Sequence, residues 1–234
     1  EHITLLTLSN HTSGLPRLPD NFEYHSSDPS DPYKDYTKQY LFSYLKTCKP
    51  VTKPGESYAY SNLAVGLLGT ILEEVSGKSF AEMVQEIICD PLNMQSTRQH
   101  LNPVQRQRFV KVYNEEGKET SPWSFSALAP CGALRSTVND LLIYVKANMT
   151  KDDTKLSKAF DLTHQITFNK GVKLGLAWHI ILVNNVEYYF HNGGTYGSSS
   201  FLAFNTEKNI AVVILSNAQE STDELGSALL KKLQ

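Results

Sequence analysis

The chain has 234 residues, of which 41% are hydrophobic, and carries 22 basic and 24 acidic side chains for a net charge of −2. A chain of this length can bury about 70 to 75% of its unfolded surface, so a sizeable core is expected without covalent staples. The balanced charge has no long run of either sign, which argues against nucleic acid or an anionic membrane as a partner. The longest apolar runs, such as residues 210–215, are far shorter than the roughly 20 residues that cross a bilayer, so no membrane span is expected.

Metal and cofactor signatures are absent from the sequence. Cys48, Cys89 and Cys131 are odd in number, far apart and lack the paired spacing of a zinc site, so free and mostly buried thiols are predicted. The seven histidines show no H-x-x-x-H pairing, and there is no Gly-rich phosphate loop. No metal or organic cofactor is implied.

The first two-thirds of the chain reads mainly as helix. Residues 20–36 are rich in Asp, Ser and Pro and predict a long surface loop. Residues 36–48 then place apolar side chains at helical spacing. Residues 63–75 are apolar on most of a helical circumference, which predicts a buried helix that ends at Ser76-Gly77.

Two further helix starts follow. Ser79 and Glu82 form an S-x-x-E capping box before a helix that Pro91 stops. Ser136-Thr137, with Asp140 in the first turn, opens the next helix. Each start has the polar side chain that a helix N-terminus needs.

After Gly171 the composition changes to β-branched and aromatic runs separated by turn residues. GLAWHIILV and VEYYFH around Asn184-Asn185 predict one hairpin, and SSSFLAF with IAVVILSN predicts a second. The last segment, STDELGSALLKKL, returns to helical spacing. An α+β fold is expected, with residues 1–170 mainly helical and residues 171–234 forming antiparallel strands and a C-terminal helix in one domain.

Two short segments contain residues suited to catalysis. His191 is expected at the end of a strand, followed by Asn192, Gly193 and Gly194, whose backbone N–H groups could stabilise an oxyanion. An ordinary glycine loop is the alternative.

The second segment is Tyr60-Ser61-Asn62. Ser61 or Asn62 could simply cap the apolar helix, whereas a phenol at position 60 could act as a general base where positive neighbours lower its pKa from about 10. Taken alone, the tripeptide is more often a cap.

Together with HTSGLP and GALRSTVNDL, these segments resemble the serine β-lactamase and penicillin-binding-protein superfamily, in the branch of class C β-lactamases, D-alanyl-D-alanine carboxypeptidases and related esterases. The resemblance covers nearly the whole chain, in five stretches in the same order: ITLLTLSNHTSGLP, KPGESYAYSNLAVGLLGTILEEVSGKSF, IICDPLNMQST, APCGALRSTVNDLLIY and HNGGTYGSSSFLAFNTEKNIAVVILSN. It implies a β-lactamase/transpeptidase-like fold, with a helical subdomain packed on an antiparallel sheet.

The resemblance also assigns roles. Tyr60 would be the acid/base partner of the nucleophile, and Asn62 would bind the substrate amide. His191 would assist at the substrate and at Tyr60, with a positive charge that depends on pH near 6 to 7. Asn192 and Gly193 complete the third motif, and the N–H of Gly194 would be an oxyanion donor.

The family's first motif, Ser-x-x-Lys, which supplies the acylated serine and an activating lysine, would lie upstream of HTSGLP. The pattern occurs once, from Ser43 to Lys46, but after HTSGLP and on a predicted surface helix, so it is not expected to be the nucleophile. We therefore expect that the N-terminal strands and the nucleophile helix lie outside this chain, as a separate or preceding piece. We expect the chain alone to be inactive and its sheet to have an exposed edge.

A serine hydrolase acting through an acyl-enzyme on a peptide, β-lactam or ester is the main hypothesis. A catalytically inactive module that binds a peptidoglycan-like or acyl ligand is the alternative, and a purely structural role for these residues is the third. The expected partner is a small-molecule or peptide substrate, which the loop at residues 20–36 and Tyr196 would help to select. The resemblance implies a periplasmic or secreted location.

Overall fold

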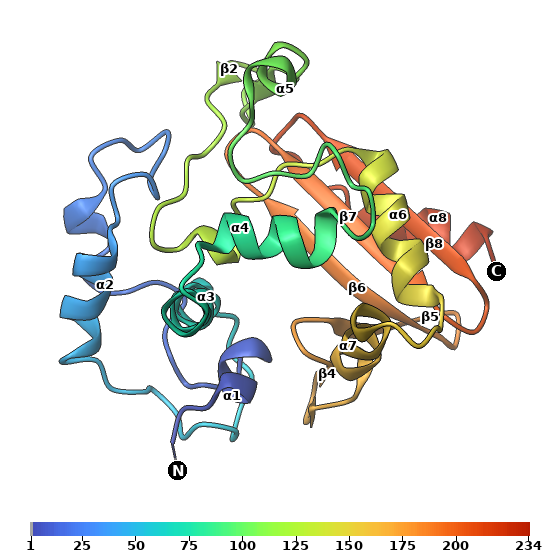
Figure 1. Ribbon diagram of the computed structural model, residues 1–234, viewed down its shortest axis with the longest axis horizontal. Coiled ribbons are helices and arrows are strands. Elements are labelled where there is room, and N and C mark those ends of the chain that lie inside the picture. Colours follow the sequence, from blue (N-terminus) through green and yellow to red (C-terminus); the bar gives the residue numbers. More distant parts are fainter. Residues whose placement is uncertain (1) are drawn as a thin grey trace.

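The computed structural model describes residues 2–234 and shows a helical part beside a twisted sheet (Figure 1). The α-helices are α1 (Leu5–Ser9), α2 (Lys38–Leu45), α3 (Asn62–Ser76), α4 (Phe80–Val84), α5 (Pro103–Gln107), α6 (Val138–Met149), α7 (Lys155–His164) and α8 (Asp223–Lys232). Short 3₁₀ turns η1 (Glu23–His25) and η3 (Ala129–Cys131) and a π-helical turn η2 (Gln85–Cys89) complete the helical elements. The strands are β1 (Val112–Tyr113), β2 (Glu119–Thr120), β3 (Phe168–Asn169), β4 (Lys173–Leu174), β5 (His179–Val183), β6 (Val186–Gly194), β7 (Ser199–Asn205) and β8 (Ile210–Ser216).

The main sheet is an antiparallel meander in the order β3-β4-β5-β6-β7-β8, and β1 pairs with β2 separately. Both predicted hairpins are confirmed. Asn184 and Asn185, between β5 and β6, have φ of 46° and 63°, as a type I′ turn requires. The strands β7 and β8 pair from Ser199↔Ser216 to Asn205↔Ile210.

Helices cover both faces of the sheet, as expected for this fold class (Figure 1). Tyr188 and Phe201 pack with Leu230 of α8 on one face. Trp178 and Phe204 pack with Val145 of α6 on the other. In sequence, α6 and α7 belong to the mainly helical part. In the structure, however, α6 packs on the sheet and covers one of its faces.

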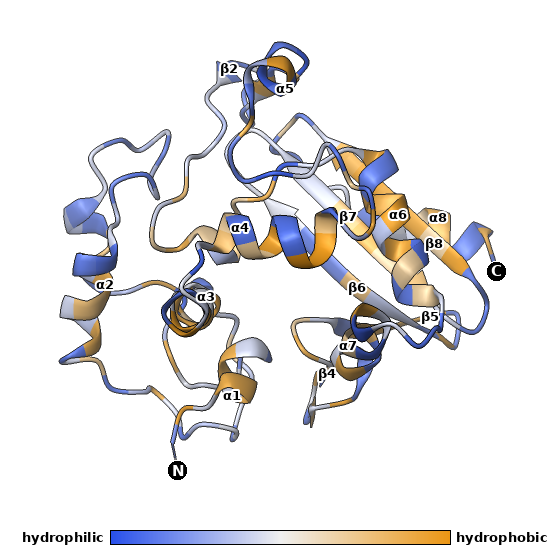
Figure 2. Ribbon diagram, in the orientation of Figure 1, coloured by the Kyte–Doolittle hydropathy of each residue, from blue (hydrophilic) through white to orange (hydrophobic). Residues whose placement is uncertain are grey.

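The helical part has its own core around α3, which Figure 2 shows to be rich in hydrophobic residues. Gly66 and Gly69 let η3 lie against α3, because a Cβ at these positions would come within 2.4 Å of Leu128 and 2.0 Å of Pro130. The prediction of a buried helix holds for residues 62–71 of α3, which are all buried or half-buried, but not for the last turn, where Val75 is 83% exposed. The apolar sequence continues to Val75 and therefore could not show where burial ends.

The helix starts agree with the sequence. The Ser61 side chain caps α3, Ser79 and Glu82 form a complete capping box on α4, and Thr137 caps α6 through the N–H of Asp140. The helix after Ser79 continues from α4 into the π-helical turn η2. Polar side chains at these positions therefore set the register of three helices.

The segment at residues 20–36 differs from the expected surface loop. Phe22 and Tyr33 are each 5% exposed, and Tyr36 is fully buried in the core of the helical part. The segment contains no apolar periodicity because its aromatic residues enter the core from an irregular backbone. Because the segment is rich in polar residues, the sequence pattern predicted a surface loop and did not indicate that these aromatic residues are buried.

Other predictions concern the surface. Ser43 on α2 and Lys46, which directly follows this helix, are both exposed. Helix α2 lies at the far side of the helical part from β6 (Figure 1). Cys48, Cys89 and Cys131 are free, but only Cys89 is fully buried. Across residues 2–234, no helix combines the length and hydropathy needed to span a membrane.

Candidate active site

The candidate site lies where the start of α3 meets the end of β6. The ring centroids of Tyr60 and His191 are 6.3 Å apart, although 131 positions separate the two residues in sequence. The fold thus brings together the two segments that the sequence singled out. Their roles in catalysis remain predictions.

Ser61 anchors the Tyr60 segment. Its Oγ accepts a hydrogen bond from the N–H of Ala64 at 2.9 Å and donates to the carbonyl of Pro16 at 2.6 Å. Its own N–H donates to Nδ1 of His11 at 3.1 Å. Ser61 is the helix cap, so the residues on either side of it are held in fixed positions.

His11 is a residue of the site that sequence reasoning missed. Its ring is 2% exposed and lies against Tyr60, with centroids 4.2 Å apart. Because Nδ1 accepts the N–H of Ser61, the proton of the neutral ring is on Nε2. Burial, followed by the charges of His191 and His179, lowers the pKa of His11 to about 3.

Nothing in the sequence pattern around His11 marks it as buried, since HTSGLP has no periodicity. Its backbone has φ of 57°, a left-handed conformation that histidine adopts more readily than most residues. The turn directs the imidazole under Tyr60. Only the resemblance to a known family drew attention to HTSGLP.

Tyr60 is a neutral phenol in this arrangement. Burial raises its pKa, and the guanidinium of Arg17, which lies 5.6 Å from the ring centroid, opposes the rise without reversing it. A general base at this position was expected to have a pKa lowered by positive neighbours. In this chain alone the pKa of Tyr60 is raised instead. Tyr60 is poised to donate a proton until another group removes it.

His191 is partly exposed and has a defined tautomer. Its Nδ1 lies 2.6 Å from the carbonyl oxygen of Asn192, which can only accept, so Nδ1 is protonated and Nε2 has the free lone pair. Burial of the ring lowers the pKa of His191. The lowered pKa favours the neutral ring over the positive charge expected from the sequence, and the neutral ring can accept a hydrogen bond at Nε2.

The two asparagines have different surroundings. The Asn62 amide donates through Nδ2 to the hydroxyl of Tyr33 at 2.9 Å, which leaves Oδ1 able to accept an N–H from a ligand. The Asn192 amide instead donates to Asp223 at the start of α8, at 2.8 Å. In this structure the carbonyl of Asn192, not its side chain, is directed to His191.

The glycines belong to β6, which continues three residues beyond His191. Gly193 and Gly194 pair with Ser200 and Ser199 of β7. The N–H of Thr195 donates to the carbonyl of Ser198, so the antiparallel alternation directs the N–H of Gly194 away from β7. Because β5 begins opposite Phe190, this N–H is not covered by the neighbouring strand and is available to an oxyanion.

A second missed histidine lies beside the site. His179 Nε2 and the hydroxyl of Tyr58 are 2.8 Å apart, and the rings of His179 and His191 are 5.9 Å apart. Burial, followed by the charge of His191, lowers the pKa of His179 to about 4. Despite the nearby histidines, no group of three His, Cys, Asp or Glu side chains in the described residues is arranged to hold a metal ion.

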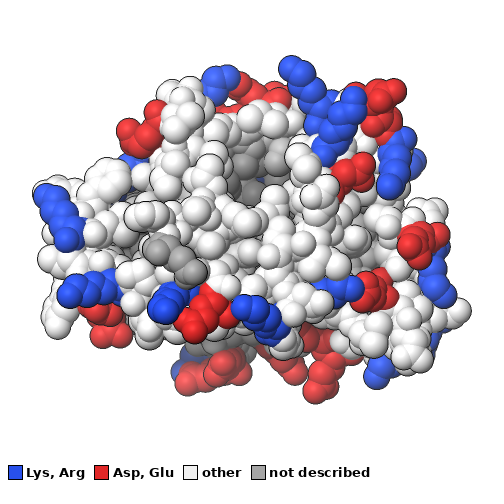
Figure 3. Space-filling model, turned by 90° about the horizontal axis from the view of Figure 1, so that it is seen from below, with Lys and Arg blue, Asp and Glu red and all other residues white. Residues whose placement is uncertain are grey.

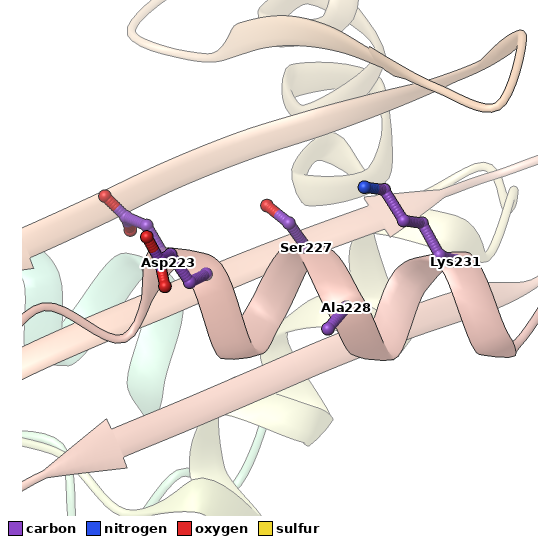
Figure 4. A pocket seen from close by; sticks show the side chains of 5 residues that line it. Asp223, Ser227, Ala228 and Lys231 are labelled. Atoms are coloured by element: carbon purple, nitrogen blue, oxygen red, sulfur yellow. The ribbon is translucent and has the colours of Figure 1, made fainter.

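Two surface features are separate from this site. A shallow depression runs along α8, where Asp223, Ser227 and Lys231 follow one another on one helix face with Ala228 beside them (Figure 4). The face seen in Figure 3 has Lys, Arg, Asp and Glu around its rim and few charges in its middle. Neither feature presents a large patch of one charge.

The family model described as Beta-lactamase matches residues 1–233, and the chain belongs to that family. Among curated proteins, the D-alanyl-D-alanine-carboxypeptidase/endopeptidase AmpH of Escherichia coli is 27% identical over 229 residues, covering 91% of this chain and 58% of that protein. A beta-lactamase of Escherichia coli is 24% identical over 253 residues, covering 92% of this chain and 63% of its own length. The chain therefore spans less than two thirds of these relatives.

Solved structures show the same fold. A class C beta-lactamase superimposes with a TM-score of 0.86 at 22% identity, over 100% of this chain and 70% of that one. The beta-lactamase/D-alanine carboxypeptidase of Pseudomonas syringae superimposes with a TM-score of 0.85 at 20% identity, over 99% of this chain and 71% of that one. The β-lactamase/transpeptidase-like fold expected from the sequence is confirmed.

Proposed function

We propose that this chain is the acid/base and oxyanion-binding part of a serine hydrolase that acts through an acyl-enzyme on a peptide, β-lactam or ester carbonyl. The main supporting observation is the meeting of Tyr60, the His191 ring and the uncovered N–H of Gly194 at one place. A phenol, an imidazole lone pair and a free backbone donor are the groups that acyl transfer requires beside the nucleophile.

In the proposed reaction a serine Oγ attacks the carbonyl carbon while its proton passes to the Tyr60 oxygen, which the upstream lysine has deprotonated. The carbonyl oxygen becomes an oxyanion held by the N–H of Gly194. Collapse of this intermediate breaks the bond to the leaving nitrogen or oxygen, which takes a proton from Tyr60. Water then attacks the acyl-enzyme and releases the acid. His191 Nε2 accepts a hydrogen bond from Tyr60 or from the substrate, and Asn62 Oδ1 accepts one from the substrate amide.

The nucleophilic serine is proposed to come from a Ser-x-x-Lys segment upstream of this chain. The lysine would remove the proton that the buried Tyr60 holds, since the pKa of Tyr60 is raised by burial and Arg17 only partly opposes this. The exposed position of Ser43 on α2 supports assigning the nucleophile elsewhere. This chain by itself is therefore expected to have no turnover.

A periplasmic or secreted location is part of the proposal. It follows the location that the family resemblance implies, and the relatives named above include a beta-lactamase and a D-alanyl-D-alanine-carboxypeptidase/endopeptidase. Cell fractionation of the source organism tests this directly.

Labelling of the full-length protein with a fluorescent penicillin, together with hydrolysis of a nitrophenyl ester, tests the proposed activity. Both signals are expected, and changing the serine of an upstream Ser-x-x-Lys to Ala should lower turnover by about 10⁶-fold. Ser43→Ala is the matched control and should leave both signals unchanged.

The pattern of results separates the candidates. Ester hydrolysis without penicillin labelling would indicate an esterase or peptidase. A full-length protein that lacks both signals but binds acyl ligands would overturn the hydrolase proposal in favour of an inactive binding module.

A further inference from the structure

A hydrogen bond between two side chains joins the helical part to the sheet beside the candidate site. The hydroxyl of Tyr58 and Nε2 of His179 are 2.8 Å apart, and the two rings meet edge to face with their centroids 5.6 Å apart. Tyr58 belongs to the segment that leads into α3, whereas His179 is the first residue of β5 and pairs with Phe190 of β6. We call this pair the Tyr58–His179 clasp.

The clasp lies next to the pair formed by Tyr60 and His191. On the helical side, the rings of Tyr58 and Tyr60 both lie against the ring of His11, at centroid distances of 6.2 Å and 4.2 Å. On the sheet side, the rings of His179 and His191 are 5.9 Å apart. Each member of the clasp is therefore a close neighbour of one member of the candidate acid/base pair.

A backbone contact fixes the start of β5 against the turn that contains His11. The N–H of Ala177 donates to the carbonyl of Ser9 at 3.1 Å, and these residues lie just before His179 and His11 in sequence. Ala177 has φ of 63°, a left-handed conformation that is unfavourable for a residue with a Cβ. Such a conformation persists only where the surrounding structure holds it, so the clasp is formed from a fixed backbone.

Packing alone does not explain a histidine at position 179. Its Nδ1 is buried and has no hydrogen-bond partner in the described residues. A neutral imidazole has one donor and one acceptor nitrogen, so one of these groups is unpaired whichever tautomer is present. A buried and unpaired polar group costs free energy that an apolar side chain of similar size would avoid. The bond to Tyr58 is what distinguishes the imidazole from such an apolar side chain.

Both members of the clasp are neutral near neutral pH. Burial, followed by the charge of His191, lowers the pKa of His179 to about 4. Burial raises the pKa of Tyr58, and the positive charge of Arg17 only partly opposes the rise. A neutral phenol and a neutral imidazole can each donate or accept, so their hydrogen bond is maintained in this range.

We propose that Tyr58 and His179 are positioning residues of the site: their hydrogen bond holds the segment with Tyr60 against the strand with His191, so that these two side chains meet during the reaction. This inference rests on the proposed hydrolase function and adds two residues that act through Tyr60 and His191 and not on the substrate. Loss of the bond lets the two sides of the site separate, and a misplacement of about 1 Å can lower a rate by about 100-fold.

Steady-state hydrolysis of a nitrophenyl ester by the full-length protein is the first test. Tyr58→Phe removes the hydroxyl and keeps the ring, so it should lower kcat by about 10- to 100-fold and change KM by less than about threefold. Tyr36→Phe is the matched control, because it removes a hydroxyl that also bonds at 2.8 Å, to Asn21 in the core of the helical part. This control should leave kcat unchanged. A kcat of Tyr58→Phe equal to that of wild type would overturn the proposal.

Variants of His179 test whether the two side chains act together. His179→Leu should lower kcat as Tyr58→Phe does, and the double variant should lose little more, because either change already breaks the same bond. His179→Gln should restore most of kcat, since its amide can bond to the Tyr58 hydroxyl. His164→Leu, which removes an imidazole bonded through Nε2 to Asn148, is the matched control and should leave kcat unchanged. Losses that multiply in the double variant, or a glutamine variant no better than leucine, would overturn the proposal.

The ring of His191 gives a readout that does not depend on turnover. In nitrogen NMR spectra of the histidine rings of the full-length protein, Tyr58→Phe should shift the His191 resonances, whereas Tyr36→Phe should not. Such a shift in a protein without turnover would overturn the hydrolase function and support the clasp as the contact that places His191. Unchanged His191 resonances in Tyr58→Phe would overturn the clasp, whether or not the protein has turnover.

Discussion

On the helical side of the site, Tyr60 and Asn62 are held by side chains, whereas on the sheet side His191 to Gly194 are held by backbone pairing. The helical side depends on Ser61, which bonds to His11 and Pro16 across 50 and 45 positions of sequence. The sheet side depends on the ladder between β6 and β7, which runs from Tyr189↔Phe204 to Gly194↔Ser199.

This difference has consequences for substitution. A change of side chain on the helical side removes a specific long-range contact, while on the sheet side most side-chain changes leave the ladder intact. The sheet side should instead be sensitive to changes in the backbone itself. The predictions below test this contrast, starting with the largest expected effect.

The largest effect is expected at the Tyr60 hydroxyl. Tyr60→Phe in the full-length protein should lower kcat by about 10²- to 10⁴-fold, because it removes the acid/base group and keeps the ring against His11. Steady-state kinetics measure this, with circular dichroism to confirm the fold and Tyr24→Phe as control. A loss below threefold would remove Tyr60 from the mechanism.

A slightly smaller effect is expected at the Gly194 N–H. Gly194→Pro removes the oxyanion donor and should lower kcat by about 10²- to 10³-fold without breaking a bond to β7. Gly194→Ala is the matched control, since a Cβ there meets no atom within 4 Å and should cost little. If alanine is as damaging as proline, the N–H is not the important group.

The free energy of unfolding should depend on pH through His11. Its pKa is about 3 in the folded chain and about 6.5 when unfolded, so the unfolded state binds more protons between these values. The contribution of His11 to the free energy of unfolding is therefore fully present above pH 6.5 and is lost as the pH falls toward 3. The expected loss is about 2 kcal/mol between pH 7 and pH 5.

Urea unfolding at several pH values checks this dependence. His11→Asn keeps a residue that tolerates positive φ and can accept the Ser61 N–H, yet does not titrate, so the loss between pH 7 and pH 5 should shrink. The exposed His100, changed to Ala, should leave the dependence as it was. An equal loss in His11→Asn and wild type would contradict the assignment.

The smallest effect is expected at Ser61. Ser61→Ala removes the cap on α3 and the bond to Pro16, and should lower the free energy of unfolding by about 1 to 2 kcal/mol. Asn192→Ala on the sheet side loses only an exposed bond to Asp223 and should change stability by about 0.5 kcal/mol or less. Equal changes in the free energy of unfolding for Ser61→Ala and Asn192→Ala, measured by urea unfolding, would contradict the proposed difference between the helical side and the sheet side.

The sequence predicted local features well where the signal is local. Polar side chains at Ser61, Ser79 and Thr137 mark helix starts because they bond to backbone N–H groups within the next three residues. The turn at Asn184-Asn185 is readable because asparagine tolerates positive φ. The segments that contain Tyr60 and His191 could be singled out from their residues, but only the resemblance assigned the two side chains their expected roles.

The sequence by itself therefore determined the fold class, the family, the hairpins and the segments that meet at the site. Only the tertiary structure decided the chemical state of these residues: the raised pKa of Tyr60, the lowered pKa of His191 with a proton on its Nδ1, and the buried His11 beside Tyr60. It also decided that the aromatic residues of the loop at residues 20–36 enter the core. The physical reason is that capping and turn formation involve neighbours in sequence, whereas burial, which shifts these pKa values, is produced by segments that folding brings together from far apart.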